Sequence, residues 1–134
     1  MATVKTFVMI KPDGVERKLV GQIIARFEQK GFTILEMKMF VPKRELIEEH
    51  YAEHKGKPFY DGLVDYVSRG TVVPMVIEGP ENTIKMIRQM IGATFSYDAT
   101  PGTIRGDFGI MKHENLIHAS DSEESAQREL KLWF

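Results

Sequence analysis

The sequence predicts one α+β domain spanning residues 1–134, with strands and helices that alternate along the chain. Three observations support this class. The length of 134 residues is that of a single domain. Apolar residues recur at strand spacing in some segments and at helix spacing in others. The segments follow the order strand, helix, strand, two helices, strand, helix, strand, helix. This order fits a split βαββαβ arrangement with an antiparallel sheet, and a small doubly wound parallel sheet is the competing topology.

The first two elements are a strand and a helix joined by a turn. Residues 4–10 are rich in β-branched and apolar side chains, which is typical of a buried strand. Residues 11–14 contain proline and glycine and predict a turn. Residues 20–30 place apolar side chains at helical spacing, and Gly31 follows as a helix C-cap.

The middle of the chain predicts a strand and two helices. Residues 32–41 alternate between apolar and polar types, as in a strand with one buried face. Pro42 favours the first turn of a helix, which we expect to run to about residue 54. Residues 58–69 predict a shorter helix that ends at Gly70.

The last part of the chain supplies the remaining strands and helices. Residues 71–78 are dense in valine and isoleucine and predict a third strand, and residues 81–91 carry isoleucines on one face of a helix. Residues 92–103 show no periodicity and form a loop long enough to suggest function. Residues 106–111 predict a fourth strand, and residues 120–132 a final helix.

The composition excludes several kinds of protein. The formal net charge of -1 provides no positive field, so nucleic acid is not expected as a partner. The chain has no cysteine, which excludes disulfides and cysteine-based metal sites. No apolar stretch is long enough to span a bilayer, and residues 1–6 do not resemble a signal peptide. We therefore expect a cytoplasmic protein without a membrane partner.

An anionic ligand would have to be bound by local clusters of basic side chains. The sequence has neither of the familiar glycine-rich phosphate loops. Lys11 follows the first strand, and Arg88 and Arg105 flank the long loop. Three converging cations are suited to a polyphosphate, with arginine in bidentate contact. The alternative for each of them is a solvated surface charge.

Three of the four histidines are expected to be solvated. His50 and His54 have the spacing of a helical metal pair, but the sequence lacks both the H-E-x-x-H pattern and a third ligand. A metal site is therefore not favoured there. His113 lies among charged residues at the end of the expected fourth strand and is predicted to face solvent.

The fourth histidine, His118, precedes the last helix, where Ser120 and Glu123 have the spacing of a capping box. Glu129 on that helix is placed to hydrogen-bond one ring nitrogen, which would fix the tautomer and leave the other nitrogen as a nucleophile. The alternative is a core histidine satisfied by a neighbour. Phe59 likewise either stacks on a nucleobase or belongs to the core.

Three runs of sequence carry a resemblance to a known family. They are residues 10–15 (IKPDGV), 101–108 (PGTIRGDF) and 115–122 (NLIHASDS) followed by 124–126 (ESA). Their order and spacing along essentially the whole chain resemble nucleoside diphosphate kinase. Each run alone is a weak signal, whereas the combination is highly specific.

The resemblance implies a ferredoxin-like βαββαβ sandwich, with a four-stranded antiparallel sheet covered by helices and a C-terminal helix. It implies ping-pong transfer of the terminal phosphoryl group from a nucleoside triphosphate to a nucleoside diphosphate through a phosphohistidine at His118. The implied cofactor is Mg²⁺, held mainly by the nucleotide phosphates and not directly by the protein. The implied catalytic residues are His118, Glu129, Lys11, Tyr51 and Ser120. The implied nucleotide contacts are Lys11, Phe59, Arg88, Thr94, Arg105, Asn115 and Lys112.

The resemblance also implies a homo-oligomer built from dimers that pair along residues 32–41. Ala119 replaces the usual glycine beside the histidine, and Lys112 stands where the second wall of the base site is usually apolar. Phe95-Ser96 replaces the usual Asn-Pro in the loop that would join dimers. Without this proline the unfolded loop has more entropy to lose. Together with the end of the chain at Phe134, this predicts dimers that associate only weakly into larger rings.

Two other classes of protein remain as alternatives. An RNA-recognition domain has the same element order, but it requires aromatic side chains on its central strands, and residues 71–77 contain none. A nucleotide-binding regulatory module on the same fold would not require His118 together with Glu129.

Overall fold

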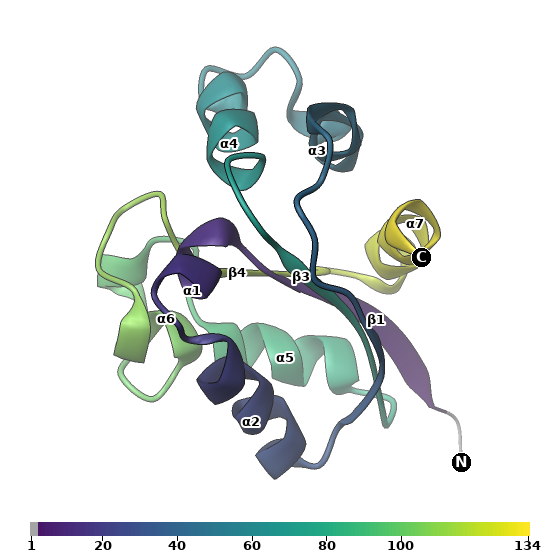
Figure 1. Ribbon diagram of the computed structural model, residues 1–134. Coiled ribbons are helices and arrows are strands. Elements are labelled where there is room, and N and C mark those ends of the chain that lie inside the picture. The colour runs from purple at the N-terminus through teal and green to yellow at the C-terminus, as the bar shows by residue number, and fades with distance from the viewer. Residues whose placement is uncertain (1–2) are drawn as a thin grey trace.

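The computed structural model describes residues 3–134 as a four-stranded sheet with helices on both faces (Figure 1). The strands follow the order β2-β3-β1-β4 across the sheet. Every neighbouring pair is antiparallel, so the split βαββαβ arrangement is confirmed and the parallel alternative is wrong. The strands are β1 (Val4–Ile10), β2 (Thr33–Met37), β3 (Val73–Gly79) and β4 (Ile117–Ala119).

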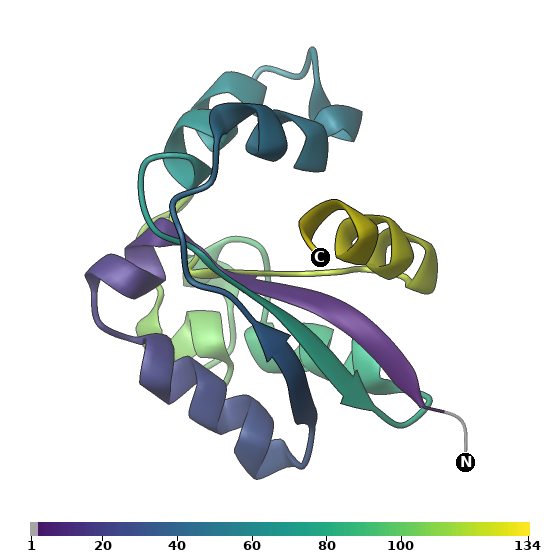
Figure 2. The same cartoon turned by 45° about the vertical axis from the view of Figure 1, so that its right-hand side comes forward.

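The helices form two layers, one on each face of the sheet. Figure 2 shows α2 and α5 on one face and α3, α4 and α7 on the other. None of the helices in residues 3–134 has the length and apolar character needed to cross a bilayer. The α-helices are α1 (Pro12–Glu16), α2 (Val20–Lys30), α3 (Arg44–His50), α4 (Tyr60–Val67), α5 (Thr83–Ile91), α6 (Ile104–Phe108) and α7 (Glu123–Trp133), and the 3-10 turns are η1 (Ala52–His54) and η2 (Ser96–Asp98).

The inner strand β1 separates two hydrophobic cores. Val8 and Ile10 pack with α2 and α5, while Phe7 and Met9 pack with α3, α4 and α7. All four side chains are fully buried. Burial on both faces explains why residues 4–10 form a nearly continuous apolar run and not a strict alternation.

The predicted fourth strand is wrong. Residues 104–108 form α6, which begins at Thr103, whose hydroxyl accepts a hydrogen bond from the N–H of Gly106. A side chain at Gly106 would collide with the carbonyl oxygen of Thr100, so this tight helical start requires glycine. The fourth strand is instead β4, three residues that pair with Val8–Ile10 of β1.

Several other boundaries differ from the prediction. The turn at residues 11–14 is the beginning of α1, and the expected helix to residue 54 is interrupted at Tyr51 between α3 and η1. The cap of the last helix is Ser122 and not Ser120, because the Ser122 hydroxyl accepts the N–H of Ser125. The hydroxyl of Ser120 makes a different contact, described below.

The second strand is shorter than expected and lies at an edge of the sheet. β2 pairs with β3 alone among the described residues, with an irregularity between Ile34 and Glu36. An isolated bridge between Phe40 and Val72 continues the pairing beyond β2. Apolar side chains on this edge, including Leu35 and Met37, are about half exposed.

Candidate active site

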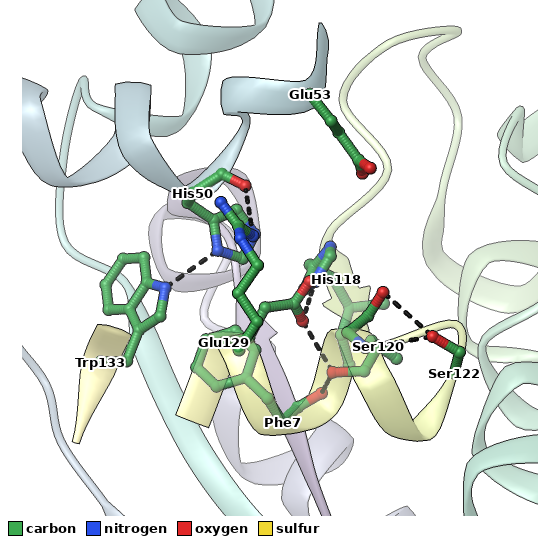
Figure 3. Close-up of polar contacts among 12 residues, drawn as sticks. Phe7, His50, Glu53, His118, Ser120, Ser122, Glu129 and Trp133 are labelled. Atoms are coloured by element: carbon green, nitrogen blue, oxygen red, sulfur yellow. Dashed lines mark hydrogen bonds and ion pairs between the residues drawn. The ribbon is translucent and has the colours of Figure 1, made fainter. Parts of the chain in front are cut away.

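The catalytic candidate His118 lies in β4, opposite Met9 of β1. Helix α7 follows β4 and brings the buried carboxylate of Glu129 to the His118 ring, with 2.9 Å between Nε2 and Oε1 (Figure 3). The Ser120 hydroxyl donates to the same Oε1 over 2.7 Å. Because the carboxylate accepts, Nε2 carries the proton of the neutral ring and the lone pair of Nδ1 is free. The structure thus contains the ring-to-carboxylate contact that the sequence predicted.

Burial and neighbouring cations keep the His118 ring neutral. Desolvation and the charges of Lys11, Arg105 and Arg88 hold the pKa of His118 well below its usual value. The same cluster acts on its own members, since burial and the charge of Arg105 lower the pKa of Lys11 to about 7. A neutral imidazole beside several cations is suited to attack an anionic phosphate.

Lys11 is held at the end of β1 by residues from two other segments. It is 5% exposed, and its Nζ donates to Oδ1 of Asn115 over 2.7 Å. Asp13 accepts hydrogen bonds from the Tyr66 hydroxyl and from the N–H of Leu116, over 2.5 and 3.1 Å. Leu116 has a φ of 73°, which is unfavourable for leucine and which these contacts stabilise. The turn before β4 is therefore fixed against the end of β1.

Arg105 is buried, and most of its donors are bound to backbone carbonyl groups. Burial, followed by the charge of Arg88, lowers the pKa of Arg105 to about 10. Four of its five N–H groups are engaged and one remains for a ligand. The carbonyl partners are Asn115 with Nε (3.1 Å), Ile117 with Nη2 (2.6 Å), and Gly92 and Ala93 with Nη1 (3.1 and 3.3 Å). Arg105 therefore joins α5 and the long loop to β4.

Arg88 and Thr94 each take part in one hydrogen bond with a residue in or next to β4. Nη1 of Arg88 donates to the carbonyl of Ala119 over 3.1 Å, next to His118 in β4. Nδ2 of Asn115 donates to the carbonyl of Thr94 over 2.8 Å. The cations Lys11, Arg88 and Arg105 from three segments thus act on His118, whereas Thr94 is exposed and is connected to the site through its carbonyl.

His50 is not solvated, and this prediction is wrong. It is 3% exposed, because α7 brings Trp133 against the end of α3 and the indole N–H donates to Nδ1 of His50 over 2.9 Å. The rings of His50 and His118 meet edge-to-face at a centroid distance of 4.6 Å. Tyr51 follows His50 and is also buried, with its ring 6.3 Å from that of His118.

The residues expected to bind the base are exposed at the protein surface. Phe59 is about half exposed, so the alternative that it belongs to the core is wrong, and its ring is 5.3 Å from that of the partly buried His54. Nζ of Lys112 lies 5.5 Å from the centroid of the Phe95 ring. Lys112 therefore covers an aromatic residue of the long loop, a contact that the sequence did not indicate.

One group of side chains in the site has the types and spacing of metal ligands. Nitrogen atoms of His50 and His118 and a carboxylate oxygen of Glu129 lie within 4.8 Å of one another. Their protein contacts compete with a metal, because Trp133 occupies Nδ1 of His50 and Glu129 occupies Nε2 of His118. The carboxylate of Glu129 also accepts a hydrogen bond from the Ser120 hydroxyl.

The sequence did not reveal the contributions of His50, Trp133 and Asp13. His50 and Trp133 are 83 residues apart and meet only through the packing of α3 on α7. Asp13 looked like a turn residue, and its partner Tyr66 lies in α4. The sequence offered one signal that His50 belongs to the site: it is adjacent to Tyr51 near the end of a helix.

Comparison with known proteins gives a consistent result. A family model described as nucleoside diphosphate kinase matches residues 4–134. The nucleoside diphosphate kinase of Archaeoglobus fulgidus is 56% identical over 130 residues, covering 97% of this chain and 85% of that protein. That of Schizosaccharomyces pombe is 53% identical over 134 residues, covering 100% and 88%. The structure of a halophilic nucleoside diphosphate kinase from Halobacterium salinarum in complex with CDP matches with a TM-score of 0.95 and 50% identity, covering 99% and 88%.

Proposed function

The chain belongs to the nucleoside diphosphate kinase family and is a phosphotransferase, and from this premise we propose that His118 carries the phosphoryl group between two nucleotides. The observation that carries the proposal is the His118 ring itself. Its Nε2 is bound to Glu129, its Nδ1 is free, and neighbouring cations keep it neutral. The chain acts as one catalytic domain in this proposal, because β1 contributes to both cores.

The reaction consists of two half reactions at the same nitrogen. Nδ1 of His118 attacks the terminal phosphorus of a nucleoside triphosphate, the bond to the bridging oxygen breaks, and the diphosphate leaves. The terminal phosphate oxygen of a second diphosphate then attacks the phosphohistidine and restores the free ring. Glu129 holds the ring and its Nε2 proton throughout. Lys11, Arg88 and the remaining N–H of Arg105 stabilise the phosphate charge.

The nucleotide brings its own divalent cation in this proposal. Mg²⁺ suits the reaction because it neutralises phosphate charge when it binds. The buried carboxylates of Asp13 and Glu129 already accept hydrogen bonds from the protein. The phosphates are therefore the main ligands of Mg²⁺. A cytoplasmic location is also part of the proposal, because the chain has no cysteine.

Transfer of label from γ-³²P-ATP tests the proposal. In the presence of Mg²⁺ the protein should take up one phosphoryl group, which is stable in alkali and lost in acid, as a phosphoramidate is. Addition of unlabelled GDP should move the label into GTP. A regulatory module would bind the nucleotide without becoming labelled. Absence of a labelled protein under single-turnover conditions would contradict the proposal.

We expect Phe59 to contribute more to nucleotide binding than Lys112. Loss of stacking in Phe59→Ala should weaken binding by about 1–3 kcal/mol. Lys112→Val removes a charge that lies over the exposed Phe95 ring, so the change should be about 1 kcal/mol or less. The Kd values of both variants for ADP and GDP check the difference. Equal or reversed losses would show that the base does not stack on Phe59.

Binding of nucleotide is expected to be coupled to proton uptake at Lys11. The pKa of about 7 means that the ammonium group has mostly lost its proton at pH 8, and a bound polyphosphate raises this pKa. Uptake should therefore approach one proton per site at pH 8 and be close to zero at pH 6. Calorimetric titration with ADP in buffers of different ionisation enthalpy measures it. Lys11→Arg, whose side chain is charged at both pH values, is the matched control and should show no uptake.

The exposed edge of β2 is proposed as the dimer interface. A second copy would pair with the free edge of Thr33–Met37 and bury side chains such as Leu35. Leu35→Lys should weaken the dimer by roughly tenfold or more, because a buried leucine contributes about 1.5–3 kcal/mol. Light scattering over a dilution series measures this, and rings larger than the dimer should dissociate first. Ile110→Lys, an exposed apolar residue outside β2, should leave the dimer intact.

A further inference from the structure

Two polar atoms beside His118 are buried and have no hydrogen-bond partner within residues 3–134: Nε2 of His50 and the hydroxyl oxygen of Tyr51. Both residues stand at the end of α3, and both rings meet that of His118 edge-to-face. An unsatisfied buried donor is unfavourable, and such groups in native proteins call for an explanation. A hydrogen-bond partner that is present only during the reaction would explain why these two atoms are unpaired.

Trp133 determines which nitrogen of His50 carries the proton. The indole nitrogen is a donor only, and its N–H donates to Nδ1 of His50. Nδ1 must therefore accept, and the neutral ring carries its proton on Nε2. Burial, with a smaller effect of His118, holds the pKa of His50 well below its usual value. The Nε2–H group is thus a fixed donor that is unpaired among the described residues.

His50 lies directly beside the ring that would carry the phosphoryl group, with 4.6 Å between the two ring centroids. Figure 3 shows His50 between Trp133 and His118, and ring nitrogens of the two histidines lie within 4.8 Å of each other. A phosphoryl group on Nδ1 of His118 extends beyond the ring and brings oxygen acceptors with it. We propose that the Nε2–H of His50, oriented by Trp133, donates a hydrogen bond to the phosphoryl group on His118. This inference rests on the proposed function, because it requires the phosphohistidine.

A metal-binding role for the same group is the competing explanation. Zn²⁺ binds histidine and carboxylate ligands, and His50, His118 and Glu129 supply them. A metal on His50 would need either Nδ1, which accepts from Trp133, or Nε2, which carries the proton. Nucleotide-free protein is therefore expected not to bind Zn²⁺ at this group. Stoichiometric Zn²⁺ binding that disappears in His50→Phe would overturn the donor role.

The wild-type protein tests the proposal directly by NMR of ¹⁵N-labelled histidine. After phosphorylation with Mg-ATP and removal of nucleotide, the Nε2 proton of His50 should move downfield and exchange more slowly with water. An unchanged resonance in fully phosphorylated protein would overturn the inference and leave the proposed function standing. Absence of any phosphohistidine signal would instead contradict the proposed function.

Single-turnover kinetics provide an independent test with matched variants. His50→Phe keeps a planar ring and removes the donor, so phosphorylation by Mg-ATP should slow by about 10–100-fold, the effect of one hydrogen bond to a charged group. His50→Gln keeps an N–H near the position of Nε2 and should stay within roughly fivefold of wild type. Trp133→Phe removes the hydrogen bond that fixes the tautomer of His50. Its phosphorylation rate should therefore lie between those of wild type and His50→Phe.

Nucleotide binding distinguishes a donor from a purely structural residue. The Kd for ADP should stay within about threefold of wild type in His50→Phe, because the lost bond forms only with the transferred group. Two results would overturn the proposal: a His50→Phe rate equal to that of wild type, or a folded His50→Gln that is as slow as His50→Phe.

Discussion

Replacement of His118 by alanine is expected to lower phosphoryl transfer by roughly 10⁴-fold or more, as loss of the nucleophile does in other covalent enzymes. Nδ1 of His118 has a free lone pair near Lys11, Arg88 and Arg105, whereas the lone pair of His50 at Nδ1 accepts from Trp133. The fold should survive, because the ring lies at the rim of the core and its side chain is 20% exposed. A phosphoenzyme assay with labelled ATP, combined with steady-state transfer from ATP to GDP, measures the loss.

The matched control is His113→Ala. His113 is exposed and lies on the loop before β4, so its removal should change transfer by less than about twofold, as at other surface positions. Thermal unfolding of both variants separates loss of chemistry from loss of structure. Label that remains on His118→Ala at a comparable rate would show that another residue is the nucleophile.

Arg105→Met is expected to destabilise the protein by about 3–5 kcal/mol in addition to impairing catalysis. The guanidinium binds four carbonyl groups from α5, the long loop and β4, and methionine would leave these acceptors without their donors. Each unsatisfied buried group costs about 1–3 kcal/mol, and part of that cost is relieved by water and by the loss of a buried charge. Urea unfolding without nucleotide measures the change.

Arg88→Met is the matched control for this effect. Arg88 donates one hydrogen bond, to the carbonyl of Ala119, so the change in stability should be about 1 kcal/mol. Its effect on nucleotide affinity should be larger, because more of its donors are available to phosphate. If the two variants were equally stable, the structural role assigned to Arg105 would be incorrect.

The elements that the sequence predicted well are those with a strong local pattern. The limits of β1 and α2 coincide with the predicted segments, and Gly31 has the left-handed φ of 109° expected of a C-cap. The prediction of a strand at residues 106–111 failed because the local cap at Thr103 and the close approach of Gly106 to Thr100 favour a short helix. The true fourth strand has three residues, too few for periodicity to be detected.

The contacts of the site follow the same rule: those between residues near in sequence were predicted, and those between distant segments were not. Glu129 was placed beside His118 because it lies on the helix that directly follows β4, and a local argument reaches that far. The burial of His50 was not predicted, because it depends on Trp133 arriving from the other end of the chain. The carbonyl contacts of Arg105 likewise depend on three segments that meet only in the folded protein. Sequence patterns identified the chemical groups, whereas their packing required the structure.

The pairing of β4 with β1 has a consequence for how the protein folds. Met9 and His118 are neighbours in the sheet although more than a hundred residues separate them along the chain. Closing so long a loop is entropically costly, and such non-local contacts slow folding. Intermediates that contain β1, β2 and β3 with α2 would already bury much of one core and yet lack the nucleophile in its place. Recovery of phosphoryl transfer after dilution from denaturant therefore reports the last long-range closure and not the early collapse of the chain.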